Sequence, residues 1–181
     1  VFSGFKDTVL YNNGNLTVSG CAFANNTLYG KKIIYSENST GNLKIVESEF
    51  YDNKAYNIIR SESDILINGS VFENNTAFED EGNIIELRSV NSVNIISTEF
   101  VENTVGSHGI FVYLCSDVHI NAEFYNNTLK RAINSLDTSD LNIEDSIFTG
   151  NTFEYAIYSK SEHTQKITGS TFTENTVKNV V

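Results

Sequence analysis

Few side chains in this sequence have the chemistry that catalysis or metal binding needs, and they lie far apart. The histidines and arginines are His108, His119, His163, Arg60, Arg88 and Arg131. Hydrolysis by acid–base chemistry needs two carboxylates held together, but no two aspartates are adjacent in the sequence. Ser107-His108-Gly109 comes nearest to a catalytic turn, and we interpret His108 as an ordinary turn residue. The sequence has no Ser-His-Asp order, Cys/His metal spacing or phosphate-binding glycine loop.

Acidic residues gather at two places that could hold a cation or contact a sugar. Glu79-Asp80-Glu81 follows Phe78 in an insertion that must point outward, and we favour a solvated turn there. Glu49, Glu99 and Glu123 share one position of a repeat and should form an outward column. Because two carboxylates seldom complete the six to eight ligands of calcium, we expect no cofactor, with calcium as the alternative.

A repeat of about 24 residues organises the chain. Its signature is a phenylalanine followed three residues later by an asparagine, and the phenylalanines are separated by 27, 22, 28, 24, 24 and 24 residues. Apolar pairs lie before each phenylalanine and again eight to twelve residues after it. The seven asparagines of the signature are Asn26, Asn53, Asn75, Asn103, Asn127, Asn151 and Asn175.

Three short alternating segments in each copy are typical of β-strands. Three strands cannot bury their own apolar residues, but stacked copies can, with equivalent strands about 4.8 Å apart. The sequence therefore predicts an all-β fold: a right-handed parallel β-helix of about seven rungs and three sheets. Residues 9–181 form the single β-helix domain, and residues 1–8 are an irregular start or part of a preceding rung. The arginines occur at different phases of the repeat, so we expect that stacking alone does not bring them onto one face.

The signature asparagines have a structural interpretation. Each follows an inward phenylalanine at the point where the chain must leave one sheet for the next. Asparagine tolerates the left-handed backbone conformation better than most residues do, so we expect the signature asparagines to adopt it. Their amides can also bond to the equivalent amides one rung away. We therefore predict a continuous internal asparagine ladder and no ligand at these residues.

The amino-acid composition argues against some classes of function. The chain has 12 Lys and Arg against 23 Asp and Glu, a formal net charge of −11. Without a basic patch, a nucleic-acid partner is not expected. Apolar runs are far shorter than the roughly 20 residues that span a bilayer, so this segment should not cross a membrane. There is no Met, and both ends fall at the same phase of the rung, so we expect a segment of a longer array.

Residues Gly14–Thr27 and Tyr155–Ser159 carry a family resemblance. They resemble the Phe-x-x-Asn repeats of chlamydial polymorphic outer membrane proteins, and they are similar to adhesin-like β-helix proteins of methanogens and protists. The Gly-Gly-Ala-Ile element of that family is reduced here to forms such as Gly109-Ile110. The resemblance covers nearly the whole chain from about Val9 and implies a secreted or cell-surface β-helix used for adhesion or as a rod.

Cysteines and glycosylation sequons fit this location. Cys21 and Cys115 lie about three rungs apart, too far for a disulfide. We expect Cys21 to be a buried thiol, and for Cys115 we favour a buried thiol over an exposed one that links to a neighbour. Six Asn-x-Ser/Thr sequons could be N-glycosylated, although a repeat rich in these residues creates sequons by itself. The sequon asparagines are Asn15, Asn25, Asn38, Asn68, Asn74 and Asn126.

The leading hypothesis is a non-catalytic extracellular β-helix that serves as a surface rod, an adhesive stalk or an end-to-end fibre. Its partners would be further rungs of the same chain, a second copy, or surface glycans and receptors. The alternatives are a polysaccharide-active, pectate-lyase-like enzyme and a carbohydrate-binding module. Catalytic groups of the enzyme would lie in the longer rungs, around Glu37–Thr40 or Glu79–Glu81.

Overall fold

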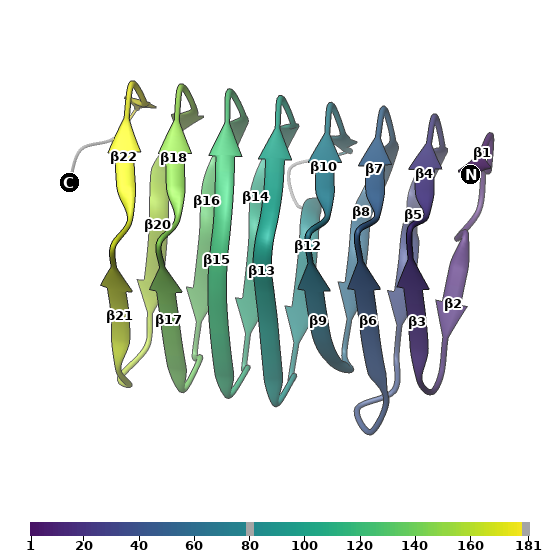
Figure 1. The fold of residues 1–181 in the computed structure, drawn as a ribbon, viewed down its shortest axis with the longest axis horizontal. Helices are drawn as coiled ribbons and strands as arrows, with labels where there is room; N and C mark the ends of the chain where they lie inside the picture. Colours follow the sequence, from purple (N-terminus) through teal and green to yellow (C-terminus); the bar gives the residue numbers. More distant parts are fainter. Residues whose placement is uncertain (79–81, 179–181) are drawn as a thin grey trace.

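The protein is a parallel β-helix. The structure, a computed structural model, describes residues 1–78 and 82–178, and these form strands and turns without any helix. In Figure 1 the chain runs up the front, down the back and advances from right to left, which makes the coil right-handed. Every paired strand is parallel to its neighbours and equivalent to them in the repeat, so the fold predicted from the repeat is confirmed.

Two sheets make up the coil (Figure 1). The front sheet has thirteen strands: β1 (Phe2–Ser3), β3 (Leu16–Ser19), β4 (Ala22–Ala24), β6 (Asn42–Val46), β7 (Glu49–Tyr51), β9 (Asp64–Asn68), β10 (Val71–Glu73), β13 (Ser92–Val101), β15 (Asp117–Tyr125), β17 (Asp140–Glu144), β18 (Ile147–Thr149), β21 (Gln165–Thr168) and β22 (Thr171–Thr173). The back sheet has ten: β2 (Leu10–Asn12), β5 (Thr27–Ser36), β8 (Lys54–Ser61), β11 (Thr76–Ala77), β12 (Asn83–Arg88), β14 (Thr104–Tyr113), β16 (Thr128–Leu136), β19 (Thr152–Phe153), β20 (Tyr155–Lys160) and β23 (Thr176–Val177).

The expectation of three sheets is therefore replaced by two. The three segments of the repeat are present, as β3, β4 and β5 show in one rung. In β13 and β15, however, the first and second segments run on as one strand through an irregularity at Ile96–Thr98. The strands before and after β13 and β15 pair with one or the other half of these long strands. The first and second segments of every rung therefore belong to one hydrogen-bonded front sheet.

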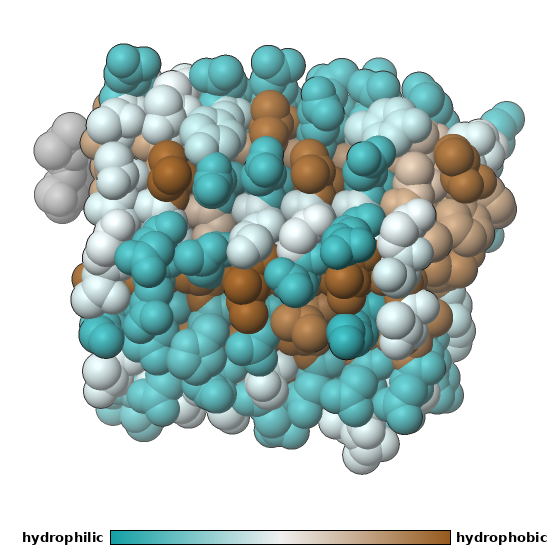
Figure 2. All heavy atoms as spheres, viewed as in Figure 1, coloured by the Kyte–Doolittle hydropathy of each residue, from teal (hydrophilic) through white to brown (hydrophobic). Residues whose placement is uncertain are grey.

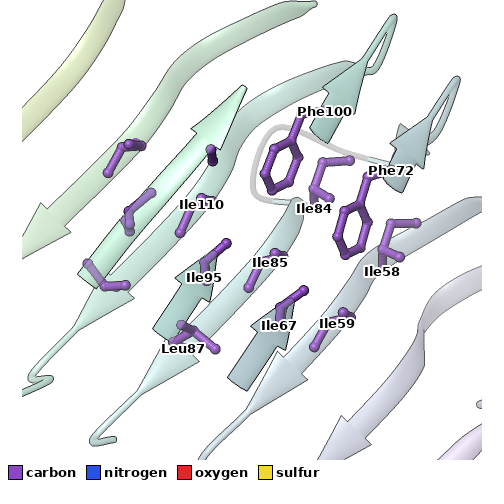
Figure 3. Close-up of a cluster of buried hydrophobic side chains, with 14 of the residues drawn as sticks. Ile58, Ile59, Ile67, Phe72, Ile84, Ile85, Leu87, Ile95, Phe100 and Ile110 are labelled. Atoms are coloured by element: carbon purple, nitrogen blue, oxygen red, sulfur yellow. The ribbon is translucent and has the colours of Figure 1, made fainter. Parts of the chain in front are cut away.

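Phenylalanine rings fill one continuous file inside the coil. The seven repeat phenylalanines align as predicted, and Phe2 adds an eighth ring because β1 pairs with β4. Successive ring centroids are 4.6–5.1 Å apart and nearly parallel, as between Phe100 and Phe124. Isoleucines from the two sheets pack beside this file (Figure 3), for example Ile85 of β12 and Ile95 of β13. The stacked rings and aliphatic columns form a single core along the axis.

The asparagine ladder runs beside the phenylalanine file. Asn103 donates from its backbone N and from Nδ2 to Asn127 Oδ1, both at 2.9 Å, and from Nδ2 to Phe72 O at 2.8 Å. The same pattern links successive asparagines from Asn26 to Asn175. At the first rung Phe5 N takes the donor position on Asn26 Oδ1. The ladder predicted from the sequence is thus present through all seven rungs.

The left-handed conformation belongs to the residue before each ladder asparagine. Those residues are Asn25, Asp52, Asn74, Glu102, Asn126, Gly150 and Glu174. The prediction that the ladder asparagine itself adopts this conformation is wrong. Because the preceding residue makes the turn, the ladder side chain points inward, where its amide satisfies backbone groups that the corner leaves unpaired.

Replacing Asn103 by alanine should cost about 2–6 kcal/mol of unfolding free energy. The change leaves the backbone N of Asn75 and the carbonyl of Phe72 unpaired in the core, and each such group costs about 1–3 kcal/mol. Asn142→Ala, on the outward side of β17, is the matched control and should change stability by less than about 0.5 kcal/mol. Urea unfolding followed by circular dichroism measures both, and equal effects would contradict the ladder's importance.

Candidate functional site

The outward surface of the back sheet collects aromatic and guanidinium side chains. Its strands contain seven of the nine tyrosines, all three arginines and Phe111. All of these are half-buried or exposed, whereas the core-facing residues are buried. We call this surface the aromatic–arginine face. Its members are Tyr11, Tyr29, Tyr35, Tyr56, Arg60, Arg88, Phe111, Tyr113, Arg131, Tyr155 and Tyr158.

Stacking alone does not align the three arginines, as expected, but irregular rungs bring them onto one face. Arg60 pairs in register with Glu86 of the neighbouring strand, and Arg88 follows Glu86 by two residues on the same side of β12. A register shift in β14 then sets Arg131 opposite His108. Variation in rung length and strand register thus brings residues of different repeat phase onto one surface.

Glu86 is a carboxylate with only 3% of its surface exposed. Asn57 Nδ2 donates to its Oε2 at 2.7 Å, and Arg88 Nε donates to its Oε1. Arg60 Nε lies 3.9 Å from the same oxygen, and its Nη2 donates to Glu62 Oε1 at 3.0 Å. A buried carboxylate without partners would be very costly, and the two guanidinium groups and the amide offset that cost for Glu86.

The arginines also stack on aromatic rings. The guanidinium carbon of Arg88 lies 5.4 Å from the centre of the Phe111 ring and 5.6 Å from that of Tyr113. That of Arg131 lies 4.1 Å from the centre of the Tyr158 ring. Such cation–π contacts fix a guanidinium group in place. Arg131 differs from Arg88 because it forms no ion pair with any described carboxylate.

His108 is a buried strand residue and not the turn residue that we expected. It lies in β14 with 8% of its surface exposed, and Asn134 Nδ2 is 2.9 Å from its Nε2. Its Nδ1 is buried and has no hydrogen-bond partner in residues 1–78 and 82–178. Burial lowers the pKa of His108 to about 4, and the cations of Arg131 and Lys130 contribute. His108 is therefore neutral at pH 7, and with Asn134 donating to Nε2 it carries its proton on Nδ1.

A pocket of about 260 Å³ opens between these groups. It is lined by Tyr56, Asn83, Glu86, Arg88, Ser107, His108 and Phe111. The Ser107 hydroxyl makes no hydrogen bond with any described residue, although Ser107 is only 7% exposed. Acceptors, donors and an aromatic face thus converge on one small, mostly buried site.

The front sheet has a larger hollow, of about 410 Å³, beside His119. The polar residues that line it are half-buried or exposed, and the front of the molecule is mostly hydrophilic with scattered apolar residues (Figure 2). His119 Nε2 lies 3.0 Å from Asp117 Oδ1, two residues earlier on the same strand. Because its polar groups already face water, this hollow is the weaker candidate for a binding site.

The structure places the remaining predicted residues in different surroundings. Glu99 and Glu123 are neighbours in one outward column, as expected, and Glu123 accepts a hydrogen bond from Tyr125, whose pKa this bond raises to about 12. Glu79-Asp80-Glu81 lies outside the described residues.

Cys115 is a buried free thiol, as predicted, whereas Cys21, also free, is half-exposed and not buried. Nowhere in residues 1–78 and 82–178 do three His, Cys, Asp or Glu side chains meet as a metal site would require.

The sequon asparagines fall into two groups. Asn25, Asn68 and Asn126 are exposed, and their side chains make no hydrogen bond with described residues. The other three already have partners: Asn15 Oδ1 accepts from Asn42, Asn38 Oδ1 accepts from Thr40, and Asn74 Nδ2 donates to Asp52. Asn25, Asn74 and Asn126 share one corner of the coil, so attached sugars there would form a line along the axis.

Comparisons with known proteins give no match from which a function could be inferred. No family model, curated protein or solved structure matches the chain. In the part of the chain that the structure describes, no helix is long and apolar enough to span a membrane. The aromatic–arginine face and its pocket are therefore the features from which a binding role can be argued.

The low pKa of His108 makes stability depend on pH. Between about pH 4 and pH 6.5, His108 is protonated in the unfolded chain but stays neutral in the folded chain. The unfolding free energy therefore decreases as the pH is lowered through this range. The loss should reach the order of 3 kcal/mol. The His108→Gln variant should lack this loss of stability, whereas the contribution of the carboxylates to the pH dependence should be unchanged. Urea unfolding of both proteins at pH 7 and pH 4.5 measures the difference, and parallel losses would contradict this pKa.

Proposed function

We propose that the protein is a non-catalytic β-helix scaffold of an extracellular or cell-surface structure, acting as a rod, an adhesive stalk or a fibre segment. The observation that carries this proposal is the continuity of the interior. Seven rungs repeat the same ring stack and the same amide ladder, and all of that packing serves to hold rungs together. The resemblance of the repeats to those of adhesin-like proteins supports this role.

The polar groups of the pocket favour binding over catalysis. Both oxygens of Glu86 already accept hydrogen bonds, and two guanidinium groups lie against one of them. His108 Nε2 is engaged by Asn134, and its Nδ1 is buried away from solvent. A general acid or base needs a free atom that can exchange a proton with the substrate. These groups fit a fixed recognition surface better than a reaction centre.

Self-association has a plausible surface at the last described rung. Ile167, Phe172 and Val177 are 49%, 45% and 41% exposed, although the equivalent Ile143, Phe148 and Phe153 are fully buried one rung earlier. A further rung stacked there would bury these side chains and pair the strand edge. We propose that this rung comes from the same chain or from a second copy. N-glycosylation, if present, would decorate the corners, with Asn25, Asn68 and Asn126 as the free acceptors.

Stacking through this edge predicts concentration-dependent growth of rods. Sedimentation velocity and electron micrographs of the native protein should show end-to-end strings, and Phe172→Glu should abolish them because it places a charge in the apolar contact. Tyr29→Glu, at a 75% exposed side chain on the lateral surface, is the control and should leave the strings intact. Short separate particles at every concentration would count against a fibre. The intact mass of native material, before and after enzymatic removal of N-glycans, tests the sugars.

The second candidate is a polysaccharide-active enzyme of the pectate-lyase type, and the pocket with Glu86 and His108 is the observation in its favour. We expect no release of unsaturated or reducing sugars from polygalacturonate or other acidic polysaccharides, with or without added calcium. Robust turnover that Glu86→Gln, Glu79→Gln or Glu81→Gln abolishes would reverse the order of the two candidates. Turnover that survives all three changes would indicate a contaminating enzyme.

A further inference from the structure

We propose that the back sheet binds an acidic oligosaccharide, with a sugar carboxylate on Arg131 and the sugar rings along Phe111, Tyr155 and Tyr158. The inference rests on the adhesive role proposed above and gives it a ligand class and a site. Three observations carry it: the charge of the back sheet, the unpaired guanidinium of Arg131 and the hydroxyl-binding groups of the adjoining pocket.

The two sheets carry opposite charges. The back-sheet strands contain eight cationic residues and a single acidic one, Glu86. The eight are Lys31, Lys32, Lys54, Arg60, Arg88, Lys130, Arg131 and Lys160. The front-sheet strands contain the reverse, eight acidic residues and only Lys44 and Lys166. Packed sheets lie about 10 Å apart with their charges outside them, beyond the roughly 8 Å Debye length at physiological salt. An anion at the back sheet is therefore largely screened from the acidic front.

Arg131 is the cation best placed to receive a carboxylate. Arg60 and Arg88 are compensated by Glu86 and Glu62, whereas Arg131 forms no ion pair with a described residue. Its guanidinium group is held 4.1 Å from the Tyr158 ring centre, and its Nε is buried without a hydrogen-bond partner among the residues that the structure describes. A guanidinium fork in a fixed position is the group that binds carboxylates with two parallel hydrogen bonds.

The surroundings of Arg131 suit a sugar. Tyr155 and Tyr158 follow it on β20, and Phe111 precedes it on β14, so half-buried rings continue along the axis on both sides. Aromatic rings with an apolar body give flat contact area at a wet surface. On the neighbouring strands the pocket offers the unpaired Ser107 hydroxyl and the remaining lone pairs of Glu86, which suit ligand hydroxyls.

A nucleic acid is the competing polyanion, and the rim of the face disfavours it. Glu37, Glu62, Asp137, Glu154 and Glu162 lie in the turns beside or between the back-sheet strands. A nucleic acid carries a charge on every phosphate and needs many cations at once. A glycan with one carboxylate per sugar can place its charge on Arg131 and its uncharged hydroxyls near the rim.

The test compares oligogalacturonate with the same oligomer fully methyl-esterified, by isothermal titration of the intact chain. We expect saturable binding of the acid form and at least tenfold weaker binding of the ester, since esterification removes only the carboxylate charges. Arg131→Gln should weaken binding of the acid form at least tenfold, and Arg131→Lys should retain part of it. Lys44→Gln, which removes one charge from the front sheet, is the matched control and should bind as the wild type does.

Several outcomes would overturn the proposal. They are equal binding of acid and ester, no saturable binding of the acid form, equal losses in Arg131→Gln and Lys44→Gln, and tighter binding of a single-stranded oligonucleotide than of the glycan. If Arg131→Gln does not fold, judged by circular dichroism, the comparison of acid with ester on the wild type still decides. If the protein forms rods but binds no glycan, the proposed binding site is wrong and the structural role stands. If the glycan is bound and then cleaved, the binding site stands and the proposed non-catalytic role is wrong.

Discussion

The structure depends on the amide hydrogen bonds that the ladder asparagines make between consecutive rungs. Each corner bends the chain away from its sheet and would leave backbone groups unpaired in the interior. An inward asparagine supplies both a donor and an acceptor there, so Asn103 bonds to Asn127 ahead of it and Asn75 behind it. Such a bond exists only if the next rung offers the same residue at the same place. The hydrogen bonding at each corner therefore requires that the same residue recur in every rung along the axis.

This requirement fixes the inside of the coil and leaves the outside free to vary. Inward positions repeat phenylalanine on phenylalanine because nearly parallel rings about 4.8 Å apart fit the spacing of the rungs. Outward positions obey no such rule, and one column of the back sheet passes from Tyr35 through Arg60 and Glu86 to Phe111. Any specific function of this protein has to come from that variable exterior, since the interior is almost the same in every rung.

Within the aromatic–arginine face, similar residues have different electrostatic states. Arg60 and Arg88 meet the buried Glu86, and Arg60 also pairs with Glu62, so two cations face two carboxylates in that part of the face. Arg131, one strand beyond His108, has ring contacts but no described acidic partner, and its charge helps to keep His108 neutral. The same sheet thus offers a hydrogen-bonding pocket and, beside it, a cation that is available to a ligand.

The sequence by itself determined the β-helix, the number of rungs, the phenylalanine file and the asparagine ladder, because strict repetition reports which residues must coincide when identical units stack. It did not reveal the two-sheet hydrogen bonding, the left-handed residue before each ladder asparagine or the burial of His108. It also missed the gathering of three arginines that lie at different repeat phases. Those features arise from unequal rung lengths and from register shifts such as the one between Val105 and His108. A shift of this kind changes which side chains are neighbours across strands without changing the apolar pattern, so only the tertiary structure decides it.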